Sequence, residues 1–584
     1  MAMPSRGARV YGFGDFRLDP GKRLLVGRDG TPISLTPKAY DTLAYLVERP
    51  GSIVYKDELM QAIWPDTAVE ENNLTQNISM IRRVLGEERG QHRYIATVPG
   101  RGYQFVSGVK VDAPESVLNE SAAAASIAVL PFVNVGGDAD CEYFGDGLAE
   151  ELINAFSKLT PVRVVARTSA FSFKGKQADV RQIADQLGAN LVLEGSVRKS
   201  GNRLRITARL IDATDGYQLW SESYDRVLGG GGIFEVQDEL TPAVVDALKL
   251  KLPRGAKANV PQRQAENVRA RELYLKGRFH SFRMTRSGIE TGIPCFEEAI
   301  EFDPSYALAQ VGLAHAYRMF GLSLDMPTRE VGPKAKAAAI KAVEMDDNLA
   351  EAHAVLAFSL FMYEWTWDAV EKHVKRALEL DPNSADSHWI YAHLCSNVGR
   401  HKQALAEIAR ARELDPLSGL INAMEGQFLL HAGRTDEAIA RLREAIELDP
   451  KSRVAHMFAS SAYIEKGLFS EAVVEADTAH GLSPSATQHL AYKSYANAKL
   501  GKRAEARNAL EKLLHLSGDR YVPPYNIALS YMGLDEHDEA LVWLARAFED
   551  RDPRMIFLKV EPKWRDLRDL PTFIRLLERM NLHH

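Results

Sequence analysis

Hydrophobic positions divide the chain into three stretches with different periods. In residues 9–108, short β-prone runs surround three stretches with the 3.6-residue spacing of amphipathic helices. Residues 125–252 alternate between helix-like and strand-like segments, and residues 270–553 carry helical spacing alone. A chain of 584 residues is also too long for a single core. We therefore expect three domains, with linkers at 109–124 and 253–269 and a C-terminal cap at 554–584.

The first stretch predicts a winged helix-turn-helix of the α+β class. Strand-like pieces come first, and Thr36 then provides an N-cap with Pro37 at the first helical position. A second helix ends at Trp64, and a third, at residues 72–86, ends at Gly86. The last piece, "RYIATVPGRGYQFV", places two β-prone runs around a Pro-Gly-Arg-Gly turn, which predicts a hairpin.

The third helix has two chemically different edges. Its apolar residues recur at spacings of four, three and four, which is one buried stripe of a helix: Leu74, Ile78, Ile81 and Leu85. The opposite edge carries amides, a methionine and a cation: Asn73, Gln76, Asn77, Met80 and Arg83. Amide and guanidinium groups can form paired hydrogen bonds with base edges in the major groove of DNA. A solvated polar face is the simpler interpretation of such an edge on an isolated helix.

Three motifs make this stretch resemble the OmpR/PhoB-type DNA-binding domain: "SLTPKAYDTLAYLVERPGSIVYKDEL", "WPDTAVEENNLTQNISMIRRVLG" and "YIATVPGRGYQF". The resemblance implies a DNA-binding role for ten residues. Those on the third helix are Asn72, Asn73, Thr75, Gln76, Asn77 and Met80 toward the groove, with Arg82 and Arg83 nearer the phosphates. The other two are Arg101 at the wing tip and Thr36, which offers a phosphate contact at a helix N-terminus. Met80 stands where relatives often carry a cation.

Charge and domain order refine this expectation. Residues 1–110 contain fifteen Lys and Arg against twelve Asp and Glu, whereas the whole chain has a net charge of −6. A locally basic module fits a polyanionic partner, although the excess is small. No receiver domain precedes the module, an order that resembles one-component ToxR/CadC-like regulators. Those carry a transmembrane helix, but the longest apolar run here, residues 122–135, is too short to span a bilayer and contains Pro131.

Cysteine usage and the N-terminal sequence favour a soluble cytoplasmic protein without a membrane partner. The three cysteines are far apart and form no CxxC pair, and no signal-peptide pattern opens the chain. No phosphate-binding loop, zinc-protease or serine-hydrolase motif occurs, so we expect neither an enzyme nor a cofactor. The acidic cluster from Asp138 to Asp146 has Tyr143 where a calcium loop needs glycine, so no metal site is expected.

The middle stretch predicts a two-layer α/β domain. Its segments "EYFGDGLAEELINAFSKL", "GANLVLEGSVRKSGNRLRITARLIDATDGYQLWSESYDR" and "IFEVQDEL" resemble the TolB-N-terminal-like domain, which brings no defined activity. Gly229 to Gly232 predict a flexible loop, because no Lys-Ser/Thr pair follows them.

The third stretch predicts an all-α solenoid of tetratricopeptide (TPR) repeats. Residues recur every 34 positions in several series, such as Leu380, Leu414, Leu448, Leu482 and Leu516, and Ala404, Ala438, Ala472, Ala506 and Ala540. Glycines at 399, 433, 467 and 501 and prolines at 382, 416, 450 and 484 keep the same step. This period is typical of about eight TPR units. Residues on the first helices were expected to face a partner-binding groove: Trp389, His393, Gln427, Tyr495 and Tyr525.

Together these features predict a one-component transcriptional regulator that reads duplex DNA with its winged helix and receives a protein or peptide signal through its TPR array. A TPR scaffold whose winged helix binds protein is the main alternative. An enzyme in the middle domain is a third hypothesis and would need a convergent polar pocket. The sequence leaves the operator, the direction of regulation and the oligomeric state open.

Overall fold

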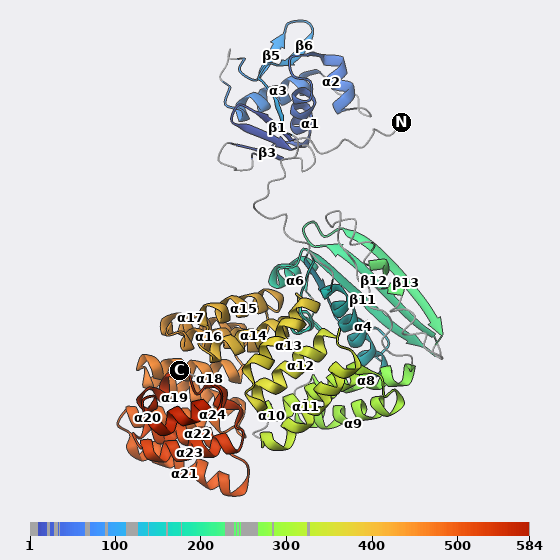
Figure 1. Ribbon diagram of the computed structural model, residues 1–584. Coiled ribbons are helices and arrows are strands. Elements are labelled where there is room, and N and C mark those ends of the chain that lie inside the picture. Colours follow the sequence, from blue (N-terminus) through green and yellow to red (C-terminus); the bar gives the residue numbers. More distant parts are fainter. Residues whose placement is uncertain are drawn as a thin grey trace. The chain divides into compact units, whose positions relative to one another are not determined.

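The computed structural model describes residues 10–582, except 20–23, 28–32, 34, 65–70, 88–91, 113–125, 138, 159–161, 177, 202, 228–238, 241, 245, 247–266, 283–284 and 324–326. The chain divides into two compact units, Met1–Ala122 and Ala123–His584 (Figure 1). The glycine loop at 229–232 and most of the two predicted linkers lie outside the described residues.

The first unit contains three helices between two antiparallel sheets. The helices are α1 (Pro37–Val47), α2 (Lys56–Ile63) and α3 (Glu71–Val84). One sheet has the order β3-β2-β1-β7, from Leu24–Val26, Phe16–Asp19, Val10–Phe13 and Lys110–Asp112. The other has the order β4-β6-β5, from Ile53–Tyr55, Gly102–Phe105 and Ile95–Val98. Because Val10 pairs with Asp112, β7 extends the domain beyond the predicted boundary at residue 108.

Local sequence explains where these elements begin and turn. The Thr36 hydroxyl accepts a hydrogen bond from the Ala39 N–H, and Pro37 occupies the first turn, so the predicted N-cap of α1 is confirmed. The predicted hairpin is β5–β6, and Gly100 in its turn has a φ of +71°. A Cβ on Gly102 would lie 2.0 Å from the Val54 carbonyl oxygen, so only glycine fits where β6 meets β4.

The second unit begins with a mixed sheet in the order β10-β8-β11-β12-β13. Its strands are β8 (Ser126–Val129), β9 (Val133–Asn134), β10 (Arg163–Val164), β11 (Leu191–Ser200), β12 (Arg203–Asp212) and β13 (Gln218–Val227). β8 runs parallel to β10 and β11, whereas β12 is antiparallel to its neighbours. The helices are α4 (Ala139–Ser157), α5 (Arg167–Phe171) and α6 (Val180–Leu187). The predicted α/β alternation is thus present.

Eight consecutive helix pairs follow among the described residues (Figure 1). They are α8 (Val268–Ser281), α9 (Arg286–Phe302), α10 (Ala307–Ser323), α11 (Thr328–Met345), α12 (Ala350–Ser359), α13 (Trp367–Leu380), α14 (Ala385–Asn397), α15 (His401–Leu414), α16 (Gly419–His431), α17 (Thr435–Leu448), α18 (Arg453–Lys466), α19 (Phe469–Leu482), α20 (Gln488–Lys499), α21 (Arg503–Asp519), α22 (Pro524–Gly533) and α23 (His537–Glu549). A short π-helix, η1 (Leu360–Glu364), extends α12.

The 34-residue series occupy two different environments. All five alanines of the series, at 404, 438, 472, 506 and 540, are fully buried where paired helices meet. The leucines behave differently: Leu414 is fully buried, whereas Leu448 is 44% exposed and Leu482 is 38% exposed. Leu414 differs because the mixed-sheet domain packs on the end of α15, where the Ala166 N–H donates to the Leu414 carbonyl oxygen.

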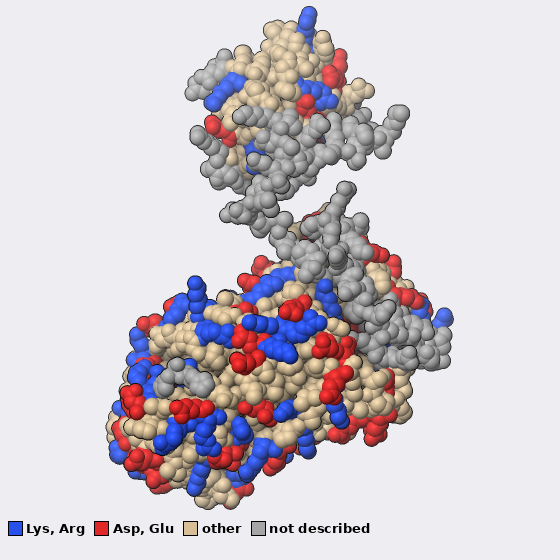
Figure 2. Space-filling model, in the orientation of Figure 1, with Lys and Arg blue, Asp and Glu red and all other residues tan. Residues whose placement is uncertain are grey.

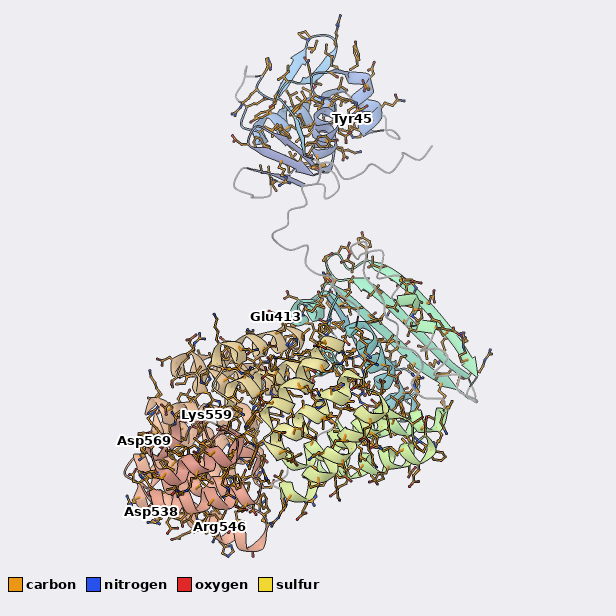
Figure 3. All side chains as sticks on the ribbon, viewed as in Figure 1. Tyr45, Glu413, Asp538, Arg546, Lys559 and Asp569 are labelled. Atoms are coloured by element: carbon orange, nitrogen blue, oxygen red, sulfur yellow. The ribbon has the colours of Figure 1, made fainter. Side chains whose placement is uncertain are left out.

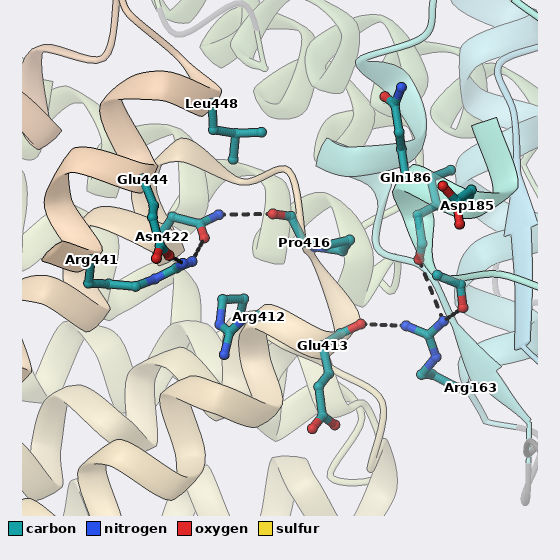
Figure 4. Close-up of a pocket in the computed structure, with 12 residues that line it drawn as sticks. Arg163, Asp185, Gln186, Arg412, Glu413, Pro416, Asn422, Arg441, Glu444 and Leu448 are labelled. Carbon is teal, nitrogen blue, oxygen red and sulfur yellow. Dashed lines mark hydrogen bonds and ion pairs between the residues drawn. The ribbon is translucent and has the colours of Figure 1, made fainter. Parts of the chain in front are cut away.

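Buried polar contacts join the mixed-sheet domain to the array within the second unit. The Ser157 hydroxyl donates to Asp381 at 2.9 Å, and the Asn383 amide donates to the carbonyls of Ser157 and Val162. One repeat later, Asp415 accepts from the hydroxyl and N–H of Ser169. Figure 3 marks Glu413 on this side of the array, and Figure 4 shows the Arg163 guanidinium donating to its carbonyl oxygen. These contacts explain why the two domains form one compact unit.

The C-terminal segment returns to the array. It comprises η2 (Pro553–Phe557), η3 (Pro562–Leu567) and α24 (Pro571–Arg579). Trp564 is fully buried and donates from Nε1 to the Tyr525 hydroxyl at 2.9 Å. The buried Lys563 ammonium donates to Glu561 and Ser461, and Trp367 Nε1 donates to the Met580 carbonyl. The segment therefore packs against helices from across the array.

Two further features concern the surface. Figure 2 shows Lys and Arg interspersed with Asp and Glu over the visible face of the second unit, without a large field of one sign. Among the described residues, no helix combines the length and the hydrophobicity needed to cross a bilayer.

Candidate nucleic-acid interface

The α3 helix presents its two predicted edges to different surroundings. Leu74, Ile78, Ile81 and Leu85 are at most 3% exposed and form part of the core of the first unit. On the other side Asn73, Thr75, Gln76 and Arg83 are exposed, and Met80 is 37% exposed. The side chain of Asn72 lies outside the described residues. Hydrophobic burial thus fixes the rotation of α3 and leaves a polar edge accessible to a partner.

Asn77 lies at the border between these two edges. Its side chain is half-buried, and its buried Nδ2 donates no hydrogen bond to any described residue. A buried amide group without a partner costs free energy in the isolated protein. A hydrogen-bond acceptor on a bound partner would remove that cost, as a base edge does for asparagine.

Thr36 and Met80 bring the start of α1 to the exposed edge of α3. The Thr36 Oγ1 lies 3.8 Å from the Met80 sulfur. The first turn of α1 carries no acidic residue, so the partial positive charge of this helix N-terminus is not neutralised within the turn. Two predicted contact residues from different helices therefore share one surface, which suits an anionic partner.

The two neighbouring arginines of α3 have different environments. Arg82 donates from Nη2 to the Ile95 carbonyl at 2.9 Å and to the Thr97 hydroxyl at 2.8 Å, and its Nε lies 3.5 Å from Glu87. Arg82 thereby ties α3 to strand β5 of the wing. Arg83 is exposed and forms no ion pair with the described residues. The phosphate role predicted for both remains a prediction, but the geometry favours Arg83.

Sequence reasoning missed Glu87, which completes this connection. Its Oε1 accepts hydrogen bonds from the N–H groups of Tyr94 and Ile95, just before and within β5. The signal in the sequence was weak, because Glu87 follows the helix-ending Gly86 and looks like an ordinary loop residue. The wing is thus positioned relative to α3 by a carboxylate and a guanidinium.

Arg101 is the exposed cation of the wing turn. Its N–H donates to the Val98 carbonyl at 3.0 Å, and its own carbonyl accepts from the Lys56 N–H at the start of α2. Among the described residues no carboxylate pairs with its guanidinium. The turn thus holds the backbone of Arg101 in place while the side chain extends into solvent.

The residues predicted to face a TPR groove lie mostly in the interior, and their role in binding a partner stays a prediction. Trp389, His393, Gln427 and Tyr525 are 2–6% exposed, and Tyr495 is half-buried. His393 stacks on Phe557 of the C-terminal segment, with ring centroids 5.5 Å apart, and burial lowers its pKa to about 3. Gln427 bonds to the His431 ring at 2.6 Å. Phe557 of η2 packs on His393 and Trp564 of η3 donates to Tyr525, whereas Trp389 packs on Phe358 of a neighbouring repeat. The 34-residue period contained no sign of these contacts.

The described residues offer no obvious metal site. They contain no group of three or more His, Cys, Asp or Glu side chains placed to hold an ion. In the acidic cluster, Glu142 and Asp146 both accept from the Lys174 ammonium, while Asp138 and the side chain of Asp140 lie outside the described residues.

Three family models match separate parts of the chain. "Transcriptional regulatory protein, C terminal" matches residues 30–105, which contain α1 to β6. "HilA/YgeH-like transcriptional regulator, second domain" matches residues 123–242, and a tetratricopeptide repeat model matches residues 429–480. The TolB-like resemblance of the middle domain remains a prediction.

Individual relatives cover different shares of the chain. A Rhizobium meliloti protein provisionally named adenylate cyclase 3 is 36% identical over 241 residues, or 40% of each chain. The transcriptional regulator HilA of Salmonella typhimurium is 25% identical over 403 residues, covering 68% of this chain and 69% of that protein. The solved DNA-binding domain of Escherichia coli CadC is 28% identical, covers 18% of this chain and all of that chain, and has a TM-score of 0.17.

These matches agree with the architecture of the two units. The first unit has the helices and wing of the regulatory-protein domain, and the second unit joins the HilA/YgeH-like second domain to the repeats. The chain therefore combines a domain of the transcriptional regulatory protein C-terminal type at residues 30–105, a HilA/YgeH-like second domain at residues 123–242 and tetratricopeptide repeats.

Proposed function

We propose that this protein is a one-component regulator that binds duplex DNA in a sequence-dependent way through the exposed edge of α3. The observation that supports the proposal best is that the apolar residues of α3 are buried, whereas Asn73, Gln76 and Arg83 are exposed. In this proposal Asn73, Gln76 and Asn77 contact base edges, and Arg83, Arg101 and the start of α1 contact phosphates. Arg82 acts indirectly by positioning the wing.

The test uses the full chain in a selection from random duplex DNA, followed by titrations at several salt concentrations. We expect one enriched sequence motif, with affinity that falls steeply as salt rises. The double variant Asn73→Ala/Gln76→Ala should lose the motif preference, whereas Arg83→Met should weaken binding to all sequences and lower the salt slope by about one. Arg17→Met, at an exposed position of β2, is the control and should bind like the wild type.

A different outcome would support the alternative of a protein-binding winged helix. If no motif is enriched and the α3 variants bind DNA like the wild type, the DNA proposal is wrong. Substitutions of Asn73 and Gln76 to apolar residues would then be compatible with function, because a protein interface tolerates them better than contacts to base edges do.

We propose no enzymatic activity and a cytoplasmic location for the chain. The sequence contains no nucleotide-binding or hydrolase motif, and the families matched are those of transcriptional regulators. One relative carries an adenylate cyclase name, so the purified chain should be incubated with ATP and Mg²⁺ and the products analysed. Accumulation of cyclic AMP above a no-protein control would overturn this part of the proposal.

We further propose that the TPR array receives a peptide or protein signal on the side now covered by the C-terminal segment. This proposal is supported by the C-terminal segment itself, because Phe557, Lys563 and Trp564 contact His393, Ser461 and Tyr525 of three different array helices. A synthetic peptide of residues 553–582 should bind a chain that ends at Asp552. Absence of binding, with helical content retained by circular dichroism, would exclude this side as a peptide site.

A further inference from the structure

A cavity lies inside the second unit, and none of its lining residues belongs to the C-terminal segment. Its volume is 330 Å³, which is within the range of small-molecule pockets. Residues of α4 and α5 line one side, and residues of α8, α10, α12, α14 and α16 line the other. The cavity therefore sits where the mixed-sheet domain meets the first repeats.

Three arginines from three different elements converge on this cavity: Arg167, Arg278 and Arg318. Their side chains are only 21%, 20% and 7% exposed. Arg167 and Arg278 share one buried carboxylate, Glu150, which lies 3.4 Å from the Arg167 Nε and accepts a hydrogen bond from Arg278. Arg318 pairs at 3.2 Å with Asp386, a residue that is 46% exposed. Of the five carboxyl groups that line the cavity, Glu150 and Asp386 thus pair with these arginines.

The other three carboxyl groups of the lining differ in their hydrogen bonds. Asp381 accepts from Ser157 and from the Asn383 N–H, and burial raises its pKa to about 6. Asp415 accepts from Ser169, and burial raises its pKa as well. Glu351 is the remaining acidic residue of the lining, and its buried Oε2 accepts no hydrogen bond from the described residues.

Aromatic rings hold the three guanidinium groups in place. The Arg167 and Arg278 guanidinium carbons lie 4.2 and 4.9 Å from the centre of the Phe282 ring. Arg318 lies 4.6 Å from the Phe358 ring and 5.9 Å from the Trp389 ring. Phe282 and Trp389 themselves line the cavity. Cations and apolar surface are thus presented together, in positions fixed by stacking.

An independent observation is a concentration of unsatisfied polar atoms. Five residues of the lining have a buried polar atom that makes no hydrogen bond to the described residues: Arg167 Nε, Arg318 Nε, Ser281 Oγ, Trp389 Nε1 and Glu351 Oε2. Buried donors and acceptors are normally satisfied, and exceptions indicate an ion, water or ligand. Three of these five atoms act only as donors, which favours a ligand rich in acceptors.

We propose that this cavity binds a small organic acid, with its carboxylate among Arg167, Arg278 and Arg318 and its apolar body against Phe282 and Trp389. Guanidinium groups match a carboxylate through paired hydrogen bonds, and the buried site strengthens that pairing. The inference goes beyond the proposed function, since it concerns a site that touches no DNA-binding residue. A bound acid would contact both the HilA/YgeH-like domain and the array.

The test is calorimetric titration of the full chain with phenylacetate, a probe with a carboxylate and an apolar ring. We expect saturable binding, and no binding of 2-phenylethanol, which has a similar shape without the charge. Two further probes test other ligand chemistries: phenyl phosphate carries a phosphate group, and phenylalanine carries an ammonium group beside its carboxylate. Binding of phenyl phosphate alone would overturn the carboxylate assignment, and binding of phenylalanine alone would show that Glu351 contributes a required contact with an ammonium group, which would also overturn it.

Variants locate the site. Arg318→Met should weaken phenylacetate binding about tenfold or more, because a charged hydrogen-bonding partner is lost. Arg318→Lys keeps the charge without the planar guanidinium group, so its affinity for phenylacetate should lie between those of the wild type and Arg318→Met. Leu420→Glu provides a variant that is safer for folding, since Leu420 lines the cavity and is 39% exposed. Its added negative charge should weaken the acid several-fold.

The matched control is Leu482→Glu, at a residue that is 38% exposed and does not line the cavity. It should bind phenylacetate like the wild type. If no acid binds, or if Arg318→Met and Leu420→Glu both bind like the wild type, the proposed site is wrong. These readouts do not involve DNA, so their failure and a failure of the DNA-binding proposal are distinguishable.

Discussion

The exposed edge of α3 and the inner helices of the TPR array contain similar residue types in opposite situations. On α3, Asn73, Gln76 and Arg83 remain exposed after the apolar edge is buried. In the array Gln427, His393 and Trp389 are buried against other repeats or the C-terminal segment. Polar and aromatic residues on a helix therefore do not identify a binding surface by themselves.

The difference teaches how each region can be tested. A covered polar or aromatic group contributes to folding stability, because its removal leaves a cavity or an unpaired partner. An exposed group contributes little to folding stability, because water solvates it in the free protein. Its removal is therefore expected to change mainly binding. Substitutions in the array should therefore change unfolding, and substitutions on α3 should change DNA affinity.

The largest expected effect is at Trp564. Trp564→Ala removes a fully buried ring and its hydrogen bond to Tyr525, so the free energy of unfolding should fall by about 3–5 kcal/mol. Urea unfolding followed by circular dichroism measures this. Trp543→Ala, at a half-buried ring, should cost about 1 kcal/mol. Equal losses in the two variants would mean that the C-terminal segment does not cover the array.

Two leucines one repeat apart provide the next test. Leu414→Ala should reduce the free energy of unfolding by about 3 kcal/mol, because Leu414 is fully buried under the mixed-sheet domain. Leu448→Ala should change it by less than about 0.5 kcal/mol, since Leu448 is 44% exposed. Similar losses at both positions would contradict the packing of the two domains against each other.

Asp381 should produce a pH-dependent effect. Burial raises its pKa to about 6, above a value of about 3.9 in an unfolded chain. The folded protein therefore holds this proton more tightly, and stability falls as the pH rises from about 4 to 6. Asp381→Asn should be more stable than the wild type by about 2 kcal/mol at pH 7.5, with a gain that shrinks toward pH 4.5.

Urea titrations at several pH values measure this difference. Asp449, the exposed residue two repeats later, is the matched control, and Asp449→Asn should change stability by less than about 0.5 kcal/mol. A gain at Asp381 that does not depend on pH would exclude the carboxyl group as its cause.

The smallest expected changes in stability are at Arg82 and Arg83, the two arginines of α3. Arg82→Met removes two hydrogen bonds to β5 and should lower the free energy of unfolding by about 1–2 kcal/mol. Arg83→Met should leave stability unchanged within about 0.5 kcal/mol and reduce only DNA affinity. Thermal unfolding of the full chain measures the change in stability, and a DNA titration measures the change in affinity. The reverse pattern would assign the phosphate contact to Arg82.

Local features of the sequence predicted much of the fold. The spacing of Leu74, Ile78 and Ile81 predicted the buried stripe of α3, and Thr36 with Pro37 predicted the start of α1. The 34-residue series predicted the buried alanines at helix pairs. These predictions succeeded because each depends on contacts between residues that are close in sequence or related by one repeat.

Long-range contacts could not be predicted in this way. Arg82 contacts β5 and Glu87 only once the wing has folded against α3. His393 packs on Phe557, which lies 164 positions later in the chain. The cavity with Arg167, Arg278 and Arg318 collects residues from three distant elements, and no spacing in the sequence connects them. Four of the five residues predicted for a TPR groove are buried and Tyr495 is half-buried, and the periodicity alone did not indicate this burial.

The sequence by itself determined the elements and their repetition, because helix periodicity, caps and turn residues act over a few positions. It thereby set which side of α3 is buried and the 34-residue repeat that forms the array. Only the tertiary structure decided which repeated positions are covered, because Leu414 and Leu448 differ solely in what packs on them. Burial depends on contacts with residues distant in the chain. Contacts of the same kind place the three arginines around one cavity.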